Sequence, residues 1–128
     1  MRIKIFQEGP KENVPYYMAV GGLKPDSRLG RDQIPVVLSG HFDIVWGLAY
    51  DFVRDEDGWI SYELEFTPEF LSMNQGLEKR IEQNYDFSLY ITDAVGVHGG
   101  GYTEGTVRAV TMFIKPGIPK DILNGHKA

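Results

Sequence analysis

The chain of 128 residues contains no cysteine, and this absence excludes several classes of protein at once. Disulfide scaffolds, zinc sites built on cysteine and thiol nucleophiles all require that residue. No stretch reaches the roughly 18 consecutive apolar residues that a membrane-spanning helix needs. The first ten residues, MRIKIFQEGP, hold too short an apolar run for a secretory signal peptide. We therefore expect a soluble protein without disulfides that is made and kept inside a cell.

Basic residues and histidines are scarce as well. The chain has 13 Lys and Arg against 18 Asp and Glu, a formal net charge of -5, and its basic residues are scattered. A nucleic-acid surface needs clustered basic residues, so we expect no nucleic-acid partner. The three histidines follow no zinc-binding spacing, so we expect neither metal nor cofactor. The chain is 42% hydrophobic and 12% aromatic, which suits one folded domain spanning residues 1–128.

Strand signals dominate the rest of the chain. Residues 60–66 alternate between apolar and polar side chains, and Asp57-Gly58 before them predicts a hairpin turn. Residues 34–53 are densely apolar, which indicates strands buried on both sides or in a barrel wall, with a break at 39–43. Further strands are expected at 2–7, 14–20, 85–91 and 106–114. The predicted fold is mainly β with minor α, a small closed or partly open antiparallel barrel of about six to seven strands.

One main helix is expected between the hairpin and the 85–91 strand. Thr67 suits the N-cap, Pro68 suits the first helical position, and Asn84 is a plausible end. The apolar residues recur on one helical face, at Phe70, Met73, Leu77 and Ile81. Residues 23–33 are expected to form an exposed loop, and residues 96–105 a glycine-rich loop.

Two residues combine in a way that predicts chemistry, His41 and Ser88. The alternation of residues 85–91 places Ser88 on the face opposite Phe87 and Leu89, and Gly40 permits a turn that aims the imidazole of His41. A serine hydroxyl becomes nucleophilic when a neighbouring base takes its proton. A metal site formed by His98 with Glu104 or Asp93 is an alternative, but it matches no known spacing.

Several segments around these residues resemble the tailed-phage prohead (capsid maturation) proteases, which are related in fold to the herpesvirus assemblins. The segments are VVLSGHFD at 36–43, VWGLAYDF at 45–52, DGWISYELEF at 57–66, YDFSLYI at 85–91 and AVTMFIKPGIP at 109–119. Their order is the order found in the family, and 47 residues separate the histidine from the serine, a gap typical of the family.

The resemblance implies a serine endopeptidase with Ser88 as nucleophile, His41 as general base and backbone N–H groups around the oxyanion. The family places an acidic residue at the start of its last strand, where this chain has Ala109 beside Arg108. Glu104 is the candidate third member, and His98 is the alternative. The expected partner is the phage major capsid or scaffold protein, met in the host cytoplasm during assembly.

Two other functions stay open, so the resemblance leaves enzymatic activity undecided. The chain could be a non-catalytic virion structural protein on the same fold, such as a capsid decoration or minor capsid protein. Its glycine-rich loop and Tyr102 would then contact the capsid shell, and a homo-oligomer is compatible with this role. An unrelated small β-barrel binding module, in which His41 and Ser88 are coincidental, is the third reading.

Overall fold

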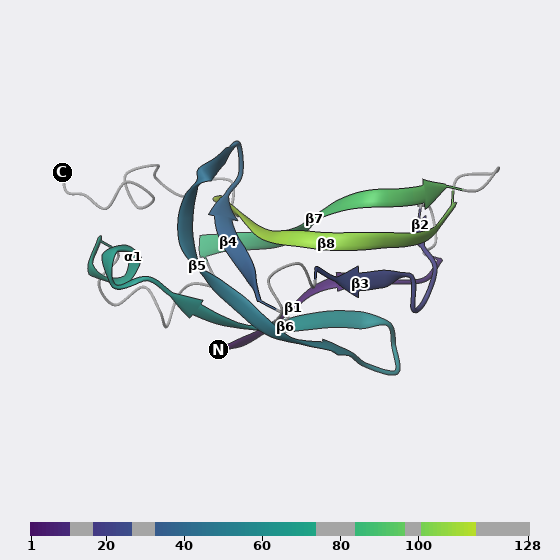
Figure 1. The fold of residues 1–128 in the computed structure, drawn as a ribbon. Coiled ribbons are helices and arrows are strands. Elements are labelled where there is room, and N and C mark those ends of the chain that lie inside the picture. The colour runs from purple at the N-terminus through teal and green to yellow at the C-terminus, as the bar shows by residue number, and fades with distance from the viewer. Residues whose placement is uncertain (11–16, 27–32, 74–83, 97–100, 115–128) are drawn as a thin grey trace.

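The structure is a computed structural model that describes residues 1–10, 17–26, 33–73, 84–96 and 101–114 (Figure 1). In these ranges eight strands form one sheet and are accompanied by one short helix. The elements are β1 (Arg2–Gln7), β2 (Tyr17–Met18), β3 (Leu23–Pro25), β4 (Ile34–Leu38), β5 (His41–Arg54), β6 (Trp59–Phe66), α1 (Pro68–Met73), β7 (Tyr85–Gly96) and β8 (Gly101–Ile114).

The long strand β8 organises the sheet. One of its sides pairs with β7 in antiparallel fashion, and its other side pairs in parallel with β2, β3 and β4 in succession. From β4 the sheet continues through β5 and β6 to β1, all antiparallel. In Figure 1 β7 and β8 run above β3 and β6, while β4 and β5 join the two layers. The sheet therefore curls into an open half-barrel. In its described part β1 and β7 lie at edges, as do the short strands β2 and β3, which pair with β8 alone.

The hydrophobic core fills the inside of this curl. The four alternating residues of β6, which the sequence predicts to face inward, are all buried, and Phe70 of α1 is buried beside them. Phe70 stacks on Phe66 with ring centroids 4.9 Å apart and also contacts Trp46 and Tyr85. The core residues are Ile3, Ile5, Met18, Leu23, Ile34, Val36, Ala49, Ile60, Tyr62, Leu64, Phe66, Phe70, Tyr85, Val107, Val110 and Met112.

Two local predictions are confirmed in detail. The β5–β6 turn contains Gly58 at a φ of 84°, and the carboxylate of Asp55 accepts hydrogen bonds from the N–H groups of Asp57 and Trp59. The helix begins at Pro68, and the hydroxyl of Thr67 accepts a hydrogen bond from the N–H of Phe70 at 3.2 Å. The structure describes α1 as far as Met73, so the remainder of the predicted helix, 74–83, lies outside the described residues.

Other expectations need correction. The sheet is mixed rather than antiparallel, and its described part has eight strands instead of six to seven. Leu23, which was expected in an exposed loop, is a buried residue of β3. Of the expected glycine-rich loop at 96–105, Gly96 belongs to β7 and residues 101–105 belong to β8, while 97–100 lie outside the described residues. Val45 and Leu48, expected to be buried, are 47% and 45% exposed.

Candidate functional site

The three residues expected to form a catalytic triad lie on three different strands. His41 is the exposed first residue of β5, Ser88 is half-buried in β7, and Glu104 is exposed in β8. The strands β4 and β8 lie between β5 and β7 in the sheet. Within the described ranges, no hydrogen bond or ion pair joins His41 to Ser88.

Ser88 lies on the face of the sheet that points away from the core. It pairs in register with Thr111 of β8, which in turn pairs with Val37 of β4. Partners across a sheet point to the same side, so these three side chains form one row. Their neighbours Phe87 and Leu89 contact the core on the other side, as the alternation of the sequence predicts.

This outer face carries a group of exposed apolar side chains, which we call the outer-face patch. The rings of Phe42 and Tyr90 lie 4.9 Å apart between centroids at an angle of 57°, although they are 50% and 45% exposed. Val37, Ala109 and Thr111 are buried but lie outside the main core cluster. The exposed members of the outer-face patch are Phe42, Val45, Leu48, Tyr90 and Phe113.

The contact between the rings of Phe42 and Tyr90 brings the chain segments that carry the two predicted catalytic residues close together. Phe42 follows His41 directly, and Tyr90 lies two residues beyond Ser88 on the same face. The start of β5 therefore reaches β7 even though two strands separate them in the sheet. The side chain that makes the contact is Phe42, while His41 is exposed beside it.

The positions around Ser88 where an acidic residue could orient a base hold other side chains. Ala109 pairs with Tyr90 and is buried, and Thr111 pairs with Ser88. His41 pairs with Leu38 of β4, and Leu38 pairs with Met112 of β8. Glu104 lies eight residues along β8 from Met112, which is roughly 27 Å at about 3.4 Å per residue. The structure does not bring Glu104 to His41, and His98 lies outside the described residues.

Asp93, the acidic residue near the end of β7, belongs to an ion-pair cluster instead. The guanidinium of Arg108 donates to the carboxylate of Asp93 and to the hydroxyl of Thr92, and it lies 3.0 Å from the buried carboxylate of Asp26. Hydrogen bonding to Asp26, and then to Asp93, raises the pKa of Arg108. Among the described residues, no group of three or more metal-ligating side chains occurs.

A second polar cluster, which the sequence did not reveal, lies where β1, β3 and β5 meet. Glu8 is 3% exposed, and its carboxylate accepts hydrogen bonds from the N–H groups of Gly21 and Leu23 at 3.0 and 2.9 Å. Arg54 donates to the same carboxylate from Nε and Nη2 and to the carbonyl of Leu23 at 2.7 Å. Burial alone raises the pKa of Glu8, but the hydrogen bonds from Arg54, Gly21 and Leu23 outweigh it, so the pKa is lowered.

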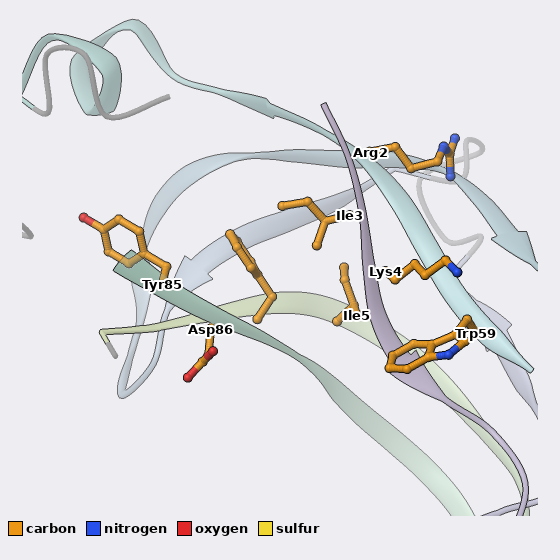
Figure 2. A pocket seen from close by; sticks show the side chains of 8 residues that line it. Arg2, Ile3, Lys4, Ile5, Trp59, Tyr85 and Asp86 are labelled. Carbon is orange, nitrogen blue, oxygen red and sulfur yellow. The ribbon is translucent and has the colours of Figure 1, made fainter. Parts of the chain in front are cut away.

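Two of the clefts on the half-barrel are lined entirely by residues that the structure describes. The larger, which we call the β1–β7 cleft, measures about 480 Å³. Figure 2 shows Ile3 and Ile5 extending from β1 toward β7, whereas Arg2 and Lys4 extend to the other side of β1. Its lining residues are Arg2, Ile3, Lys4, Ile5, Trp59, Tyr85, Asp86 and Phe87.

The smaller cleft, which we call the Tyr102 cleft, measures about 300 Å³ and is mostly apolar. Tyr17 and Tyr102, at 37% and 39% exposed, stand at its border. Its lining residues are Phe6, Tyr17, Met18, Ile91, Ala94 and Tyr102. Tyr102 is therefore accessible at the surface, where the sequence predicts that a virion structural protein would use it.

The chain was compared with protein families, curated proteins and solved structures. No family model, no curated protein and no solved structure matches the chain. In the part of the chain that the structure describes, no helix is long and apolar enough to cross a membrane.

Proposed function

We propose that this chain is a virion structural protein of a tailed phage, a capsid decoration or minor capsid protein that uses a prohead-protease-like sheet for binding instead of catalysis. Its partner would be the major capsid protein, and its site of action the assembling capsid and the virion. The outer-face patch is the observation that supports this proposal.

The size and composition of the outer-face patch suit a protein interface. Three of its five exposed members are aromatic, and aromatic residues are enriched at the centres of interfaces. An aromatic side chain buries about 150–250 Å² when it is fully covered. With Phe42, Tyr90 and Phe113 between 41% and 50% exposed, a partner would cover on the order of 300 Å² from these rings alone. That area fits the centre of an interface that buries roughly 800 Å² on each side.

A matched pair of valines on β5 tests the proposal. Val45 belongs to the outer-face patch and Val53 does not, yet their exposures are similar, at 47% and 40%. Val45→Asp would place an unpaired charge in the interface, so we expect its affinity for purified major capsid protein to fall at least about tenfold. Val53→Asp should change that affinity less than twofold. Equal effects of the two substitutions would contradict docking through the outer-face patch.

The contact between Phe42 and Tyr90 favours a second candidate, the prohead serine endopeptidase. This contact brings the chain neighbours of His41 and Ser88 together. His41 pairs with Leu38, whose partner Met112 faces the core, so the imidazole would have to turn to the outer face to reach the hydroxyl. Ser88 would then attack the scissile carbonyl, and His41 would take its proton.

Co-expression with the capsid protein separates the two candidates. An endopeptidase should cleave the capsid protein, and Ser88→Ala should abolish that cleavage, whereas Ser72→Ala, an exposed serine on α1, should not. If the chain is a structural protein, the capsid protein should stay uncleaved with the wild type, with Ser88→Ala and with Ser72→Ala. Cleavage that depends on Ser88 would overturn the structural proposal.

A further inference from the structure

We propose that the outer-face patch recognises a cationic protein surface, in which apolar residues are flanked by lysine or arginine. This inference rests on the proposed function, because it names the chemistry of the partner that docks on the same patch. The charges that border the patch are the observation that supports it.

Two exposed carboxylates border the patch on β5 and β6. Asp43 follows Phe42 directly and lies two residues before Val45. Glu65 pairs in register with Leu48, and partners across a sheet point to the same side. In the described part of the chain, neither carboxylate takes part in a hydrogen bond or an ion pair. Both are therefore open to a cation of a partner protein.

The basic residues on the same face are held by carboxylates or lie farther away. The guanidinium of Arg108 donates to Asp93 and lies 3.0 Å from the carboxylate of Asp26, so two carboxylates already share it. Lys24 is exposed, but it pairs with Thr106, and Arg108 lies between Thr106 and the patch along β8. Among the described residues beside the patch, the charges left for a partner are therefore negative.

Charge complementarity indicates the class of partner. A lysine or arginine that meets Asp43 or Glu65 would stay partly in water, so each such pair adds less than about fivefold to the affinity. Border charges mainly raise the rate of association and exclude surfaces of the same sign. Burial of the rings of Phe42, Tyr90 and Phe113 supplies the rest of the affinity. The partner surface should therefore be apolar at its centre and cationic around it, which neither an acidic protein nor a nucleic acid provides.

The same charges disfavour a second copy of this chain as the occupant. In a symmetric dimer the same patch lies on both molecules. Asp43 and Glu65 of both copies would then border one interface, where like charges oppose association. Each copy also carries a formal net charge of -5, which adds to the repulsion.

Three fluorescent synthetic peptides test the inference with the full chain. The first peptide has phenylalanine, leucine and phenylalanine at its centre and three lysines on each side. The second has glutamate in place of every lysine, and the third has alanine in place of the three apolar residues. At about 50 mM NaCl the first peptide should bind at least about threefold more tightly than either of the others. Its binding should slow hydrogen exchange at amides of β5 around Val45 and leave β1 unchanged.

A matched pair of double variants tests the position of the charges. Asp43→Asn with Glu65→Gln removes both border charges and keeps the side-chain shapes, so it should weaken binding of the lysine peptide about threefold or more. Glu56→Gln with Asp57→Asn removes the same charge from the exposed β5–β6 turn and should change binding less than about 1.5-fold. The difference between the two double variants should disappear at about 500 mM NaCl, where exposed charges are screened.

Three results would overturn the inference. One is equal binding of the lysine and glutamate peptides. Another is an equal effect of the two double variants, which would indicate unspecific attraction to an acidic chain. The third is concentration-dependent dimerisation without peptide that Val45→Asp abolishes, because a second copy would then occupy the patch.

Binding to the purified major capsid protein separates this inference from the proposed function. If Val45→Asp weakens that binding and Asp43→Asn with Glu65→Gln does not, docking through the patch stands and the cationic partner is refuted. If the lysine peptide binds as expected and the capsid protein does not bind, the inference stands and the proposed function is refuted.

Discussion

Removal of the Glu8 carboxylate should destabilise the fold more than any change at a surface charge. Glu8 ties the end of β1 to Gly21 and Leu23, and Arg54 links it to β5. Glu8→Ala leaves the backbone N–H groups of Gly21 and Leu23 without their acceptor, and the guanidinium of Arg54 loses the carboxylate and keeps the carbonyl of Leu23. Loss of one partner from a buried charge pair costs about 3–5 kcal/mol in the free energy of unfolding. Glu65→Ala, at an exposed position of β6, should cost less than about 0.5 kcal/mol.

The stability should also depend on pH in a defined direction. Because the folded-state pKa of Glu8 is below its ordinary value of 4.5, the carboxylate contributes stability that is fully present above about pH 4.5. This contribution is lost as the pH falls through the folded-state pKa. Glu8→Gln cannot titrate, so its free energy of unfolding should decrease less than that of the wild type between pH 5 and the acid limit of folding.

Urea unfolding followed by the fluorescence of Trp46 and Trp59 measures both effects. The reasoning predicts a large loss for Glu8→Ala at pH 7 and a shallower acid dependence for Glu8→Gln. A loss below about 1 kcal/mol for Glu8→Ala, or equal acid dependence of wild type and Glu8→Gln, would refute the assigned role of the cluster.

Two further substitutions test the packing. Phe70→Ala should cost about 3–5 kcal/mol in urea unfolding, because Phe70 is fully buried between Phe66, Trp46 and Tyr85; a loss under about 1 kcal/mol would mean that α1 does not pack on the sheet. Gly47→Ala should cost about 1–3 kcal/mol, because its new Cβ would lie 2.5 Å from the carbonyl oxygen of Glu65. Gly96→Ala, with its nearest atom at 3.6 Å, should be nearly neutral, and equal costs for the two glycines would contradict the close approach of β5 and β6.

The sequence predicts the parts of the fold that local chemistry determines. The alternation of β6, the Asp57-Gly58 turn and the Thr67 cap each depend on residues within one turn or one strand, and each is confirmed. The strand β3 depends instead on residues far along the chain. Leu23 is buried because β3 pairs in parallel with β8 and because Glu8 binds its N–H, and neither contact is visible in the sequence LKPD.

The sequence predicts a loop at the start of β8 because this segment is rich in glycine, and that prediction is wrong. Gly105 was expected in a loop, but it lies in the strand, where a Cβ would be 2.7 Å from the side chain of Ile91. The residue permits close packing there and not a turn. The prediction that the apolar run of β5 is buried is wrong at Val45 and Leu48, because an exposed apolar face and a strand buried on both faces have the same composition. The face of Ser88 could be predicted, but the aromatic contact of Phe42 with Tyr90 could not.

The number of copies of this chain in purified mature phage particles tests the central proposal most directly. A structural protein that docks through the outer-face patch should be present at a fixed ratio to the major capsid protein, and Val45→Asp should lower that ratio while Val53→Asp leaves it unchanged. Absence of the chain from mature particles, together with its presence in immature proheads whose capsid protein is cleaved only when Ser88 is intact, would contradict the proposal.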